Sequence, residues 1–115
     1  MTRTNELRVG KCTVLVDANE IERGGRSHRI EPKMMAVLLC LVHHAGNVVG
    51  REEIFADVWP NTFVSEDVLN RCISKLRQAL GDRRRRYIQT ISKRGYRLNA
   101  AVEPVPKPEE KHRVN

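Results

Sequence analysis

The chain has 115 residues, of which 40% are hydrophobic and 30% are charged, as expected for one globular domain with a modest core. Its formal net charge is +7 and its pI is about 9.8, so a polyanionic partner is expected. Charge alone does not separate DNA, RNA, the ribosome and an anionic membrane surface. The longest apolar run, Met34 to Val42, is too short to span a bilayer, and the N-terminal MTRTNELRVG lacks the apolar core of a signal peptide.

Three cysteines, Cys12, Cys40 and Cys72, are odd in number and have no paired spacing. Each stands in an apolar or regular stretch, which is typical of buried free thiols in a reducing compartment. The cysteines therefore predict a cytoplasmic protein without disulfides.

The N-terminal part of the chain, from Leu7 to Ile30, predicts a small antiparallel sheet. Its strand-like pieces are LRV, TVLV, NEIER and RSHRI. The turn residues Asp17-Ala18-Asn19 and Gly24-Gly25 separate them, and Gly-Gly between two extended pieces is a hairpin signal.

The stretch EPKMMAVLLCLVHHAG predicts a first helix that begins near Pro32 and is capped by Gly46. Its apolar residues follow helical spacing, so the helix is expected to be largely core. A second, shorter helix is predicted from Arg51 to Trp59. Glu52 and Glu53 stand in its first turn, where the helix dipole favours acids, and Pro60 ends it.

A third helix is predicted from the N-cap Ser65 to Gly81. One side of its helical wheel is apolar: Leu69, Cys72, Ile73, Leu76, Ala79 and Leu80. The opposite side carries side chains that read base edges by hydrogen bonds, flanked by two cations: Asn70, Arg71, Ser74 and Gln78, with Lys75 and Arg77. The alternative is an ordinary solvated face.

Residues Tyr87 to Leu98, YIQTISKRGYRL, predict a β-hairpin whose tip is Ser92-Lys93-Arg94-Gly95. Gly95 is expected to supply a positive φ. Two adjacent cations do not stabilise a turn, but the negative potential of a narrow minor groove attracts an inserted Arg or Lys. We therefore predict that Arg94 inserts and Lys93 contacts phosphate, the reverse and a solvated turn being the alternatives.

Cations are concentrated from Arg71 in the third helix to Arg97 in the hairpin, a stretch whose only acid is Asp82. They are Arg71, Lys75, Arg77, Arg83, Arg84, Arg85, Arg86, Lys93, Arg94 and Arg97. Such a one-sided block is typical of a phosphate-binding surface. The run from Arg83 to Arg86 is expected to contact phosphates without reading bases, a solvated loop being the alternative.

The order sheet, three helices, hairpin predicts an α+β fold, a winged helix-turn-helix with an N-terminal antiparallel sheet and a C-terminal β-hairpin wing. After Val102 the sequence EPVPKPEEKHRVN has too little apolar material to pack. We therefore expect a DNA-binding domain over residues 1–102 and a flexible tail or linker over residues 103–115.

The stretches VGREEIFADVW, VLNRCISKLRQALGD and YIQTISKRGYRL resemble the DNA-binding domain of OmpR/PhoB-type response regulators, over about Arg8 to Val102. SKRGYRL, and the EPK before the first helix, are most similar to the CadC/ToxR-like branch. The resemblance implies a four-stranded N-terminal sheet, a third helix in the major groove and a wing in the minor groove. Because members of that branch place this domain first in a membrane-bound regulator, it also implies a signal from a C-terminal part.

The resemblance also implies roles for individual residues. Groove or phosphate contacts fall on Arg71, Ser74, Lys75 and Arg77, and DNA-backbone contacts on Arg51, Trp59, Thr90 and Tyr96. The loop Asn61, Thr62, Phe63 stands where relatives can touch RNA polymerase, and weak homodimerisation on DNA is a further expectation. Ser92 and Lys93 depart from the family's usual wing residues, so the wing contact is not carried over.

Nothing in the sequence points to an enzyme. Cys40 and His44 have a metal-compatible spacing but no second ligand pair nearby, and there is no Gly-rich phosphate loop, nucleophile motif or pair of catalytic carboxylates. We therefore expect no catalysis, no metal and no cofactor.

The function that the sequence favours is sequence-specific binding of duplex DNA in a bacterial transcription regulator, and two alternatives stay open. One is an RNA or ribosome binder, which the 4% of aromatic residues supports poorly. The other is a winged helix used for protein contacts.

Overall fold

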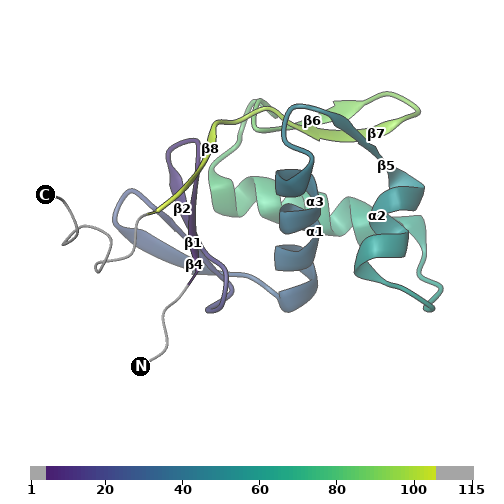
Figure 1. The fold of residues 1–115 in the computed structure, drawn as a ribbon, viewed down its shortest axis with the longest axis horizontal. Coiled ribbons are helices and arrows are strands. Elements are labelled where there is room, and N and C mark those ends of the chain that lie inside the picture. The colour runs from purple at the N-terminus through teal and green to yellow at the C-terminus, as the bar shows by residue number, and fades with distance from the viewer. Residues whose placement is uncertain (1–4, 106–115) are drawn as a thin grey trace, which may run out of the picture.

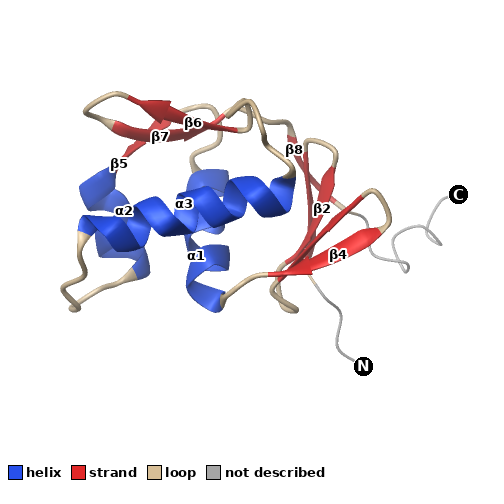
Figure 2. Cartoon of the chain, turned by 180° about the vertical axis from the view of Figure 1, so that it is seen from behind, coloured by secondary structure: helices blue, strands red, loops and turns tan. Residues whose placement is uncertain are grey.

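The structure is a computed structural model that describes residues 5–105. Three helices lie between a five-stranded sheet at one end of the molecule and a three-stranded sheet along one side (Figure 1, Figure 2). The helices are α1 (Pro32–His43), α2 (Arg51–Val58) and α3 (Glu66–Leu80). This arrangement confirms the predicted α+β winged helix.

The five-stranded sheet begins with the four strands that the sequence predicts. They are β1 (Glu6–Val9), β2 (Cys12–Leu15), β3 (Glu20–Arg23) and β4 (Arg26–Arg29), each antiparallel to its neighbour. Val9, Cys12, Val14 and Ile21 are buried against the helices, and the outer face is largely polar. The alternation of apolar and polar residues thus sets which face of this sheet meets the core.

A fifth strand, β8 (Val102–Pro104), corrects two expectations. It pairs antiparallel with β1, so that Arg8 stands opposite Glu103 and the sheet order is β4-β3-β2-β1-β8. The sheet therefore has five strands rather than four, and the predicted boundary at residue 103 falls inside a strand. The edge of β1 offers unpaired backbone groups that even a short, Pro-containing segment can bond, and Val102 adds an apolar contact to the core. The rest of the predicted tail, residues 106–115, lies outside the described residues.

All three helices begin where the sequence predicts, and α2 and α3 end within one residue of the predicted position. Ser65 is the N-cap residue of α3, without a side-chain capping bond, and Gly81 caps its C-terminus in the left-handed conformation with φ 69°. The second helix ends one residue before the predicted Trp59. The first helix ends at His43 rather than near Gly46, whose backbone N–H instead donates to the carbonyl of Leu98. Gly46 therefore links the helix exit to the wing.

The three-stranded sheet contains the predicted hairpin and one unpredicted strand. The hairpin is β6 (Ile88–Ile91) and β7 (Gly95–Leu98), and β5 (Val48–Gly50) pairs with the other edge of β7. Gly95 has φ 153°, and a Cβ there would overlap the carbonyl oxygen of Val49. Lys93, with φ 62°, takes the left-handed position of the turn. Gly95 is thus required by the close approach of β5.

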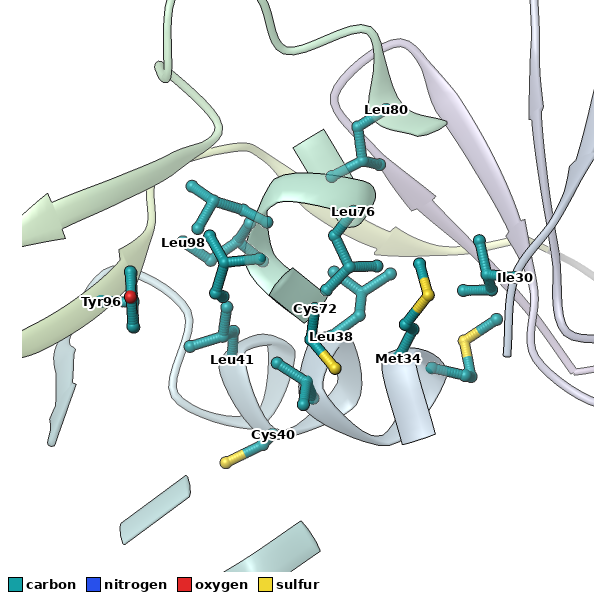
Figure 3. Close-up of a cluster of buried hydrophobic side chains, with 14 of the residues drawn as sticks. Ile30, Met34, Leu38, Cys40, Leu41, Cys72, Leu76, Leu80, Tyr96 and Leu98 are labelled. Carbon is teal, nitrogen blue, oxygen red and sulfur yellow. The ribbon is translucent and has the colours of Figure 1, made fainter. Parts of the chain in front are cut away.

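One core joins the three helices to the inner faces of both sheets. Figure 3 shows Leu38 and Leu41 of α1 facing Leu76 of α3, with Leu98 of β7 beside them. All six positions that the helical wheel of α3 predicts as apolar are buried. Truncating one of the buried leucines or Ile73 to alanine costs about 2–5 kcal/mol of stability.

The three cysteines are free and buried, as predicted. Burial raises the pKa of each thiol, that of Cys40 to about 12. They are therefore unreactive thiols that pack as small apolar groups. Over residues 5–105, no helix is both long enough and apolar enough to cross a membrane.

Candidate nucleic-acid interface

The exposed side of α3 forms one wall of a groove. Ser74 and Gln78 lie on this side, and Arg83 and Arg85 of the following loop extend the groove toward the C-terminal end of the helix. The other lining residues are Arg23, Asn70, Ile73, Arg77, Gly81, Asp82 and Tyr96. The predicted polar face is therefore part of a continuous surface of hydrogen-bonding and cationic groups.

Five of the six residues predicted to contact DNA from α3 are exposed. They are Asn70, Arg71, Ser74, Lys75 and Gln78. No large apolar side chain lies among them, since the exposed large hydrophobic residues of the described chain are Val48 and Phe63. This face of α3 thus offers no apolar patch of the kind that a protein-binding helix would expose.

Arg77 is held differently from the other five. Its guanidinium donates to the carbonyl of Ile88 from Nη2 at 2.7 Å and from Nε at 3.1 Å, and Nη2 also donates to Oγ1 of Thr90 at 2.9 Å. Burial, followed by repulsion from Arg85, lowers the pKa of Arg77. Arg77 and Thr90, both predicted DNA contacts, therefore tie α3 to β6.

A second link joins the start of α3 to α2 and the wing. Arg51 donates from Nη1 to the hydroxyl of Tyr96 at 2.9 Å and from Nη2 to Oδ1 of Asn70 at 3.1 Å. The Tyr96 hydroxyl lies 3.3 Å from the same Oδ1, and Nη2 is 3.1 Å from a carboxylate oxygen of Glu66. Three residues predicted separately as DNA contacts are thus one hydrogen-bonded cluster.

Trp59 is only 8% exposed, and its ring packs on Phe55 with a centroid distance of 5.9 Å. An aromatic ring in that position contributes to the core between α1 and α2. It leaves little surface for the DNA-backbone contact that the resemblance implies.

The wing tip is open. Lys93 and Arg94 are exposed, and the backbone N–H of Arg94 donates to the carbonyl of Ile91 at 2.9 Å, which closes the turn. The hairpin therefore presents two cations from a closed turn, as the sequence predicts.

Asp82 is a positioning residue that the sequence analysis counted only as an isolated acid. Its carboxylate is buried and accepts from the backbone N–H groups of Arg86, Tyr87 and Ile88 at 2.7–3.1 Å. Three bonds from one side chain fix the backbone of the Arg83–Arg86 loop between α3 and β6. An Asp directly after a helix-capping Gly and before four arginines was the available signal.

Arg23 also contributes in a way that the sequence did not predict. From β3 it donates through Nε to the carbonyl of Ala79 at 3.2 Å and lies over Gly81. Its side chain lines the same groove as Ser74 and Gln78. The N-terminal sheet therefore supports the C-terminal end of α3.

The predicted partner loop between α2 and α3 projects outward. Asn61 has a left-handed φ of 61°, Thr62 is exposed, and Phe63 is 100% exposed. Phe63 stands beside Phe55, Val64 and the first residues of both helices in a shallow hollow.

Within residues 5–105 there is no cluster of His, Cys, Asp or Glu side chains suited to a metal ion. His44 is turned back on its own helix, with Nδ1 3.0 Å from the carbonyl oxygen of Cys40. The Cys40 and His44 pair is therefore a local hydrogen bond and a buried thiol.

The comparisons with known proteins agree with this geometry. The family described as "Transcriptional regulatory protein, C terminal" matches residues 25–98. The chain is 36% identical over 99 residues to "Transcriptional activator CadC" of Escherichia coli and 38% identical over 91 residues to "Transcriptional regulator HilA" of Salmonella typhimurium. These matches cover 84% and 75% of this chain, but only 19% of CadC and 16% of HilA.

Solved structures show the same fold. The structure described as the DNA-binding domain of E. coli CadC has a TM-score of 0.80 and 34% identity, and the match covers 90% of this chain and all of that one (100%). The DNA-binding domain of CpxR from E. coli has a TM-score of 0.67 and 27% identity, with 84% of this chain and 98% of that chain covered. The family consists of regulator domains rather than enzymes. The chain therefore belongs to the family of transcriptional regulatory protein C-terminal domains, with the winged-helix fold of the OmpR/PhoB type.

Proposed function

We propose that this chain binds duplex DNA sequence-specifically as the DNA-binding domain of a transcription regulator. The observation that carries the proposal is the groove formed by the polar side of α3 with Arg83 and Arg85 of the following loop, together with the exposed cations of the wing tip. A major groove about 12 Å wide admits an α-helix. Relatives described as a transcriptional activator and as a DNA-binding domain support the same function.

In this proposal α3 enters the major groove and the wing reaches the adjacent minor groove. Arg71, Ser74 and Gln78 face base edges, whereas Lys75 and the loop arginines contact phosphates. Arg94 enters the minor groove and Lys93 contacts its phosphates.

Arg77 and Thr90 have a positioning role, because their mutual bond ties α3 to β6. Arg51 and Tyr96 do the same for the start of α3. Since helix and wing are joined at both ends, they dock on DNA as one rigid unit. Such preorganisation reduces the entropy lost on binding.

Selection of bound sites from a pool of random duplex DNA tests this function. We expect one sequence class to be enriched, with an A·T-rich segment at the wing's position. Single-stranded RNA should compete weakly against the selected duplex. Equal binding of all duplexes, or stronger binding of RNA, would contradict the proposal.

We also propose that the α2–α3 loop contacts a protein, RNA polymerase being the partner that the family resemblance implies. Phe63 is fully exposed beside a hollow that Phe55 and Val64 also line, and aromatic residues are enriched at protein interfaces. Phe63→Ala should leave folding and DNA affinity unchanged and weaken binding of purified RNA polymerase to the protein–DNA complex. Val48→Ala, at the other exposed large hydrophobic residue, is the matched control. Equal polymerase binding by both variants would leave the loop without this role.

The match spans 19% of the length of CadC and 16% of that of HilA, so any regulatory activity beyond DNA binding is proposed separately. We propose that the domain acts in the cytoplasm, where the DNA is. A signal would arrive through a part of the protein C-terminal to β8. Expression with and without such a part would show whether regulation depends on it.

A further inference from the structure

Asn70 lines the groove beside α3, yet its side-chain carbonyl oxygen is bonded within the protein. Oδ1 is 3.1 Å from Nη2 of Arg51 and 3.3 Å from the hydroxyl of Tyr96. An arginine guanidinium has only donors, so the oxygen of the Asn70 amide, and not its nitrogen, must face Nη2. This contact fixes the orientation of the amide.

The direction of the remaining bonds follows from the same chemistry. Nη1 of Arg51 donates to the Tyr96 hydroxyl at 2.9 Å, so this hydroxyl accepts from arginine. Its own proton is then directed to Oδ1 of Asn70. A carbonyl oxygen has two lone pairs, and in this cluster both are occupied.

The cluster is well supported by its surroundings. Tyr96 is 5% exposed, and the Arg51 guanidinium lies 5.7 Å from the centre of its ring. Glu66 adds an ion pair to Nη2, and that nitrogen also lies 3.4 Å from the Glu66 carbonyl. Releasing Oδ1 of Asn70 would leave Nη2 of Arg51 with Glu66, but it would take from the buried Tyr96 hydroxyl the acceptor of its proton, which is costly.

We infer that Asn70 contacts DNA as a hydrogen-bond donor only, through Nδ2, and does not form the bidentate pair of asparagine with adenine. That pair needs Oδ1 to accept from the adenine N6 amine while Nδ2 donates to N7. The partner of Asn70 is therefore an acceptor atom, either on a base edge or on a phosphate. The base acceptors of the major groove are purine N7, guanine O6 and thymine O4. This inference rests on the proposed function and adds the kind of atom that Asn70 recognises.

The first test uses duplexes of the selected site with single groups removed. 7-Deazapurines lack N7, 2-aminopurine in place of guanine lacks O6, 5-methyl-2-pyrimidinone in place of thymine lacks O4, and methylphosphonates lack a phosphate charge. Purine in place of adenine lacks the N6 amine. Each duplex is titrated with the wild-type chain and with Asn70→Ala. The coupling between variant and duplex isolates the contact of Asn70.

We expect one acceptor deletion to weaken wild-type binding about two- to tenfold and to have no effect on Asn70→Ala. Coupling to a base atom and coupling to a methylphosphonate distinguish the two sources of the acceptor, and both support a donor role. Coupling between Asn70 and an adenine N6 deletion would overturn the inference, as would the absence of coupling to every acceptor. If the wild type selects no sequence in the first place, the proposed function fails instead, and the inference with it.

A second variant tests the occupied oxygen directly. Asn70→Asp keeps an acceptor for Arg51 and Tyr96 but removes the donor, so the melting temperature should not fall. Its DNA affinity should drop more than that of Asn70→Ala, because the new carboxylate faces acceptors and phosphates. Wild-type affinity for Asn70→Asp would overturn the donor role, whatever the duplex series shows.

Discussion

The start of α3 and the tip of the wing both face the proposed DNA, but they are built differently. Asn70 is held by Arg51 and Tyr96, whereas Lys93 and Arg94 extend into solvent. A held side chain has already lost its rotamer freedom and offers one bonding direction. A free cation attracts any phosphate over a Debye length and loses freedom only on contact. The comparison therefore predicts that α3 reads base edges, whereas the wing tip contributes charge and responds only to the width of the minor groove.

The largest effect is expected in the loop that connects the end of α3 to β6 of the wing. Asp82→Ala removes the acceptor of three backbone N–H groups in the loop between α3 and the wing. Leaving buried donors unsatisfied should lower the free energy of unfolding by about 3 kcal/mol. Thermal or urea unfolding measures this loss. Specific binding should weaken as well, because the wing would no longer be fixed relative to α3.

Asp67→Ala is the matched control for Asp82. Asp67 is an exposed acid in the first turn of α3 whose removal changes only the helix-dipole interaction, worth about 0.3–1 kcal/mol. Equal stability of the two variants would mean that the loop needs no carboxylate to hold its shape.

Arg71 tests the specificity that the comparison assigns to α3. Arg71→Ala should weaken binding to the selected site by about 1–3 kcal/mol and relax the preference at one base step. The reason is that an exposed Arg on this face can bond two acceptors of guanine. Affinities for the selected site and for single-base variants of it measure the change.

Arg84 provides the contrast, since it lies in the loop and not on the helix. Arg84→Ala should weaken all duplexes alike and reduce the slope of log affinity against log salt by about 0.9, the release of one counterion per phosphate contact. If Arg71→Ala and Arg84→Ala lose affinity equally on specific and random DNA, the assignment of α3 to base reading is wrong.

The elements that the sequence predicted are those specified by local signals. The period of 3.6 residues placed all six apolar positions of α3 in the core, and Ser65 and Gly81 marked its ends. The two glycines at 24 and 25, like the other turn residues, separated the first four strands. Each of these features depends on neighbours in the chain.

What the sequence did not predict depends on residues far apart. β5 and β8 have three residues each and become strands only because β7 and β1 lie beside them. The partners of Asn70 are 19 and 26 residues away in the chain. The helical wheel suggested Asn70 as a DNA contact, and the family resemblance suggested Arg51 and Tyr96. Nothing in the sequence shows that these three residues contact one another.

β8 gives a prediction that separates stability from binding. A chain that ends at Ala101 lacks β8 and the bond from the Val105 N–H to the carbonyl of Glu6, so it should lose about 1 kcal/mol of stability. β8 lies at the edge of the five-stranded sheet, away from the start of α3 and the wing tip, so DNA affinity should stay the same. A chain that ends at Val105 is the control and should match the full chain in thermal unfolding. Loss of affinity on removal of β8 would mean that the N-terminal sheet takes part in binding.

The smallest effect is expected at the wing tip, where the energy of one exposed cation is at issue. Arg94→Ala should cost about 0.2–1 kcal/mol of affinity, the range of an exposed ion pair, and should leave the fold unchanged. A narrow A·T-rich minor groove concentrates negative potential, so an inserted Arg94 gains more there than beside a G·C-rich segment. We therefore expect the loss mainly on sites with an A·T-rich flank, measured against the same sites with a G·C-rich flank. Lys93→Ala is the control and should lose equally on both flanks if it contacts phosphate alone. If Arg94→Ala loses affinity equally on both flanks, Arg94 is a phosphate contact as well. In that case α3 reads bases and the wing contributes charge alone.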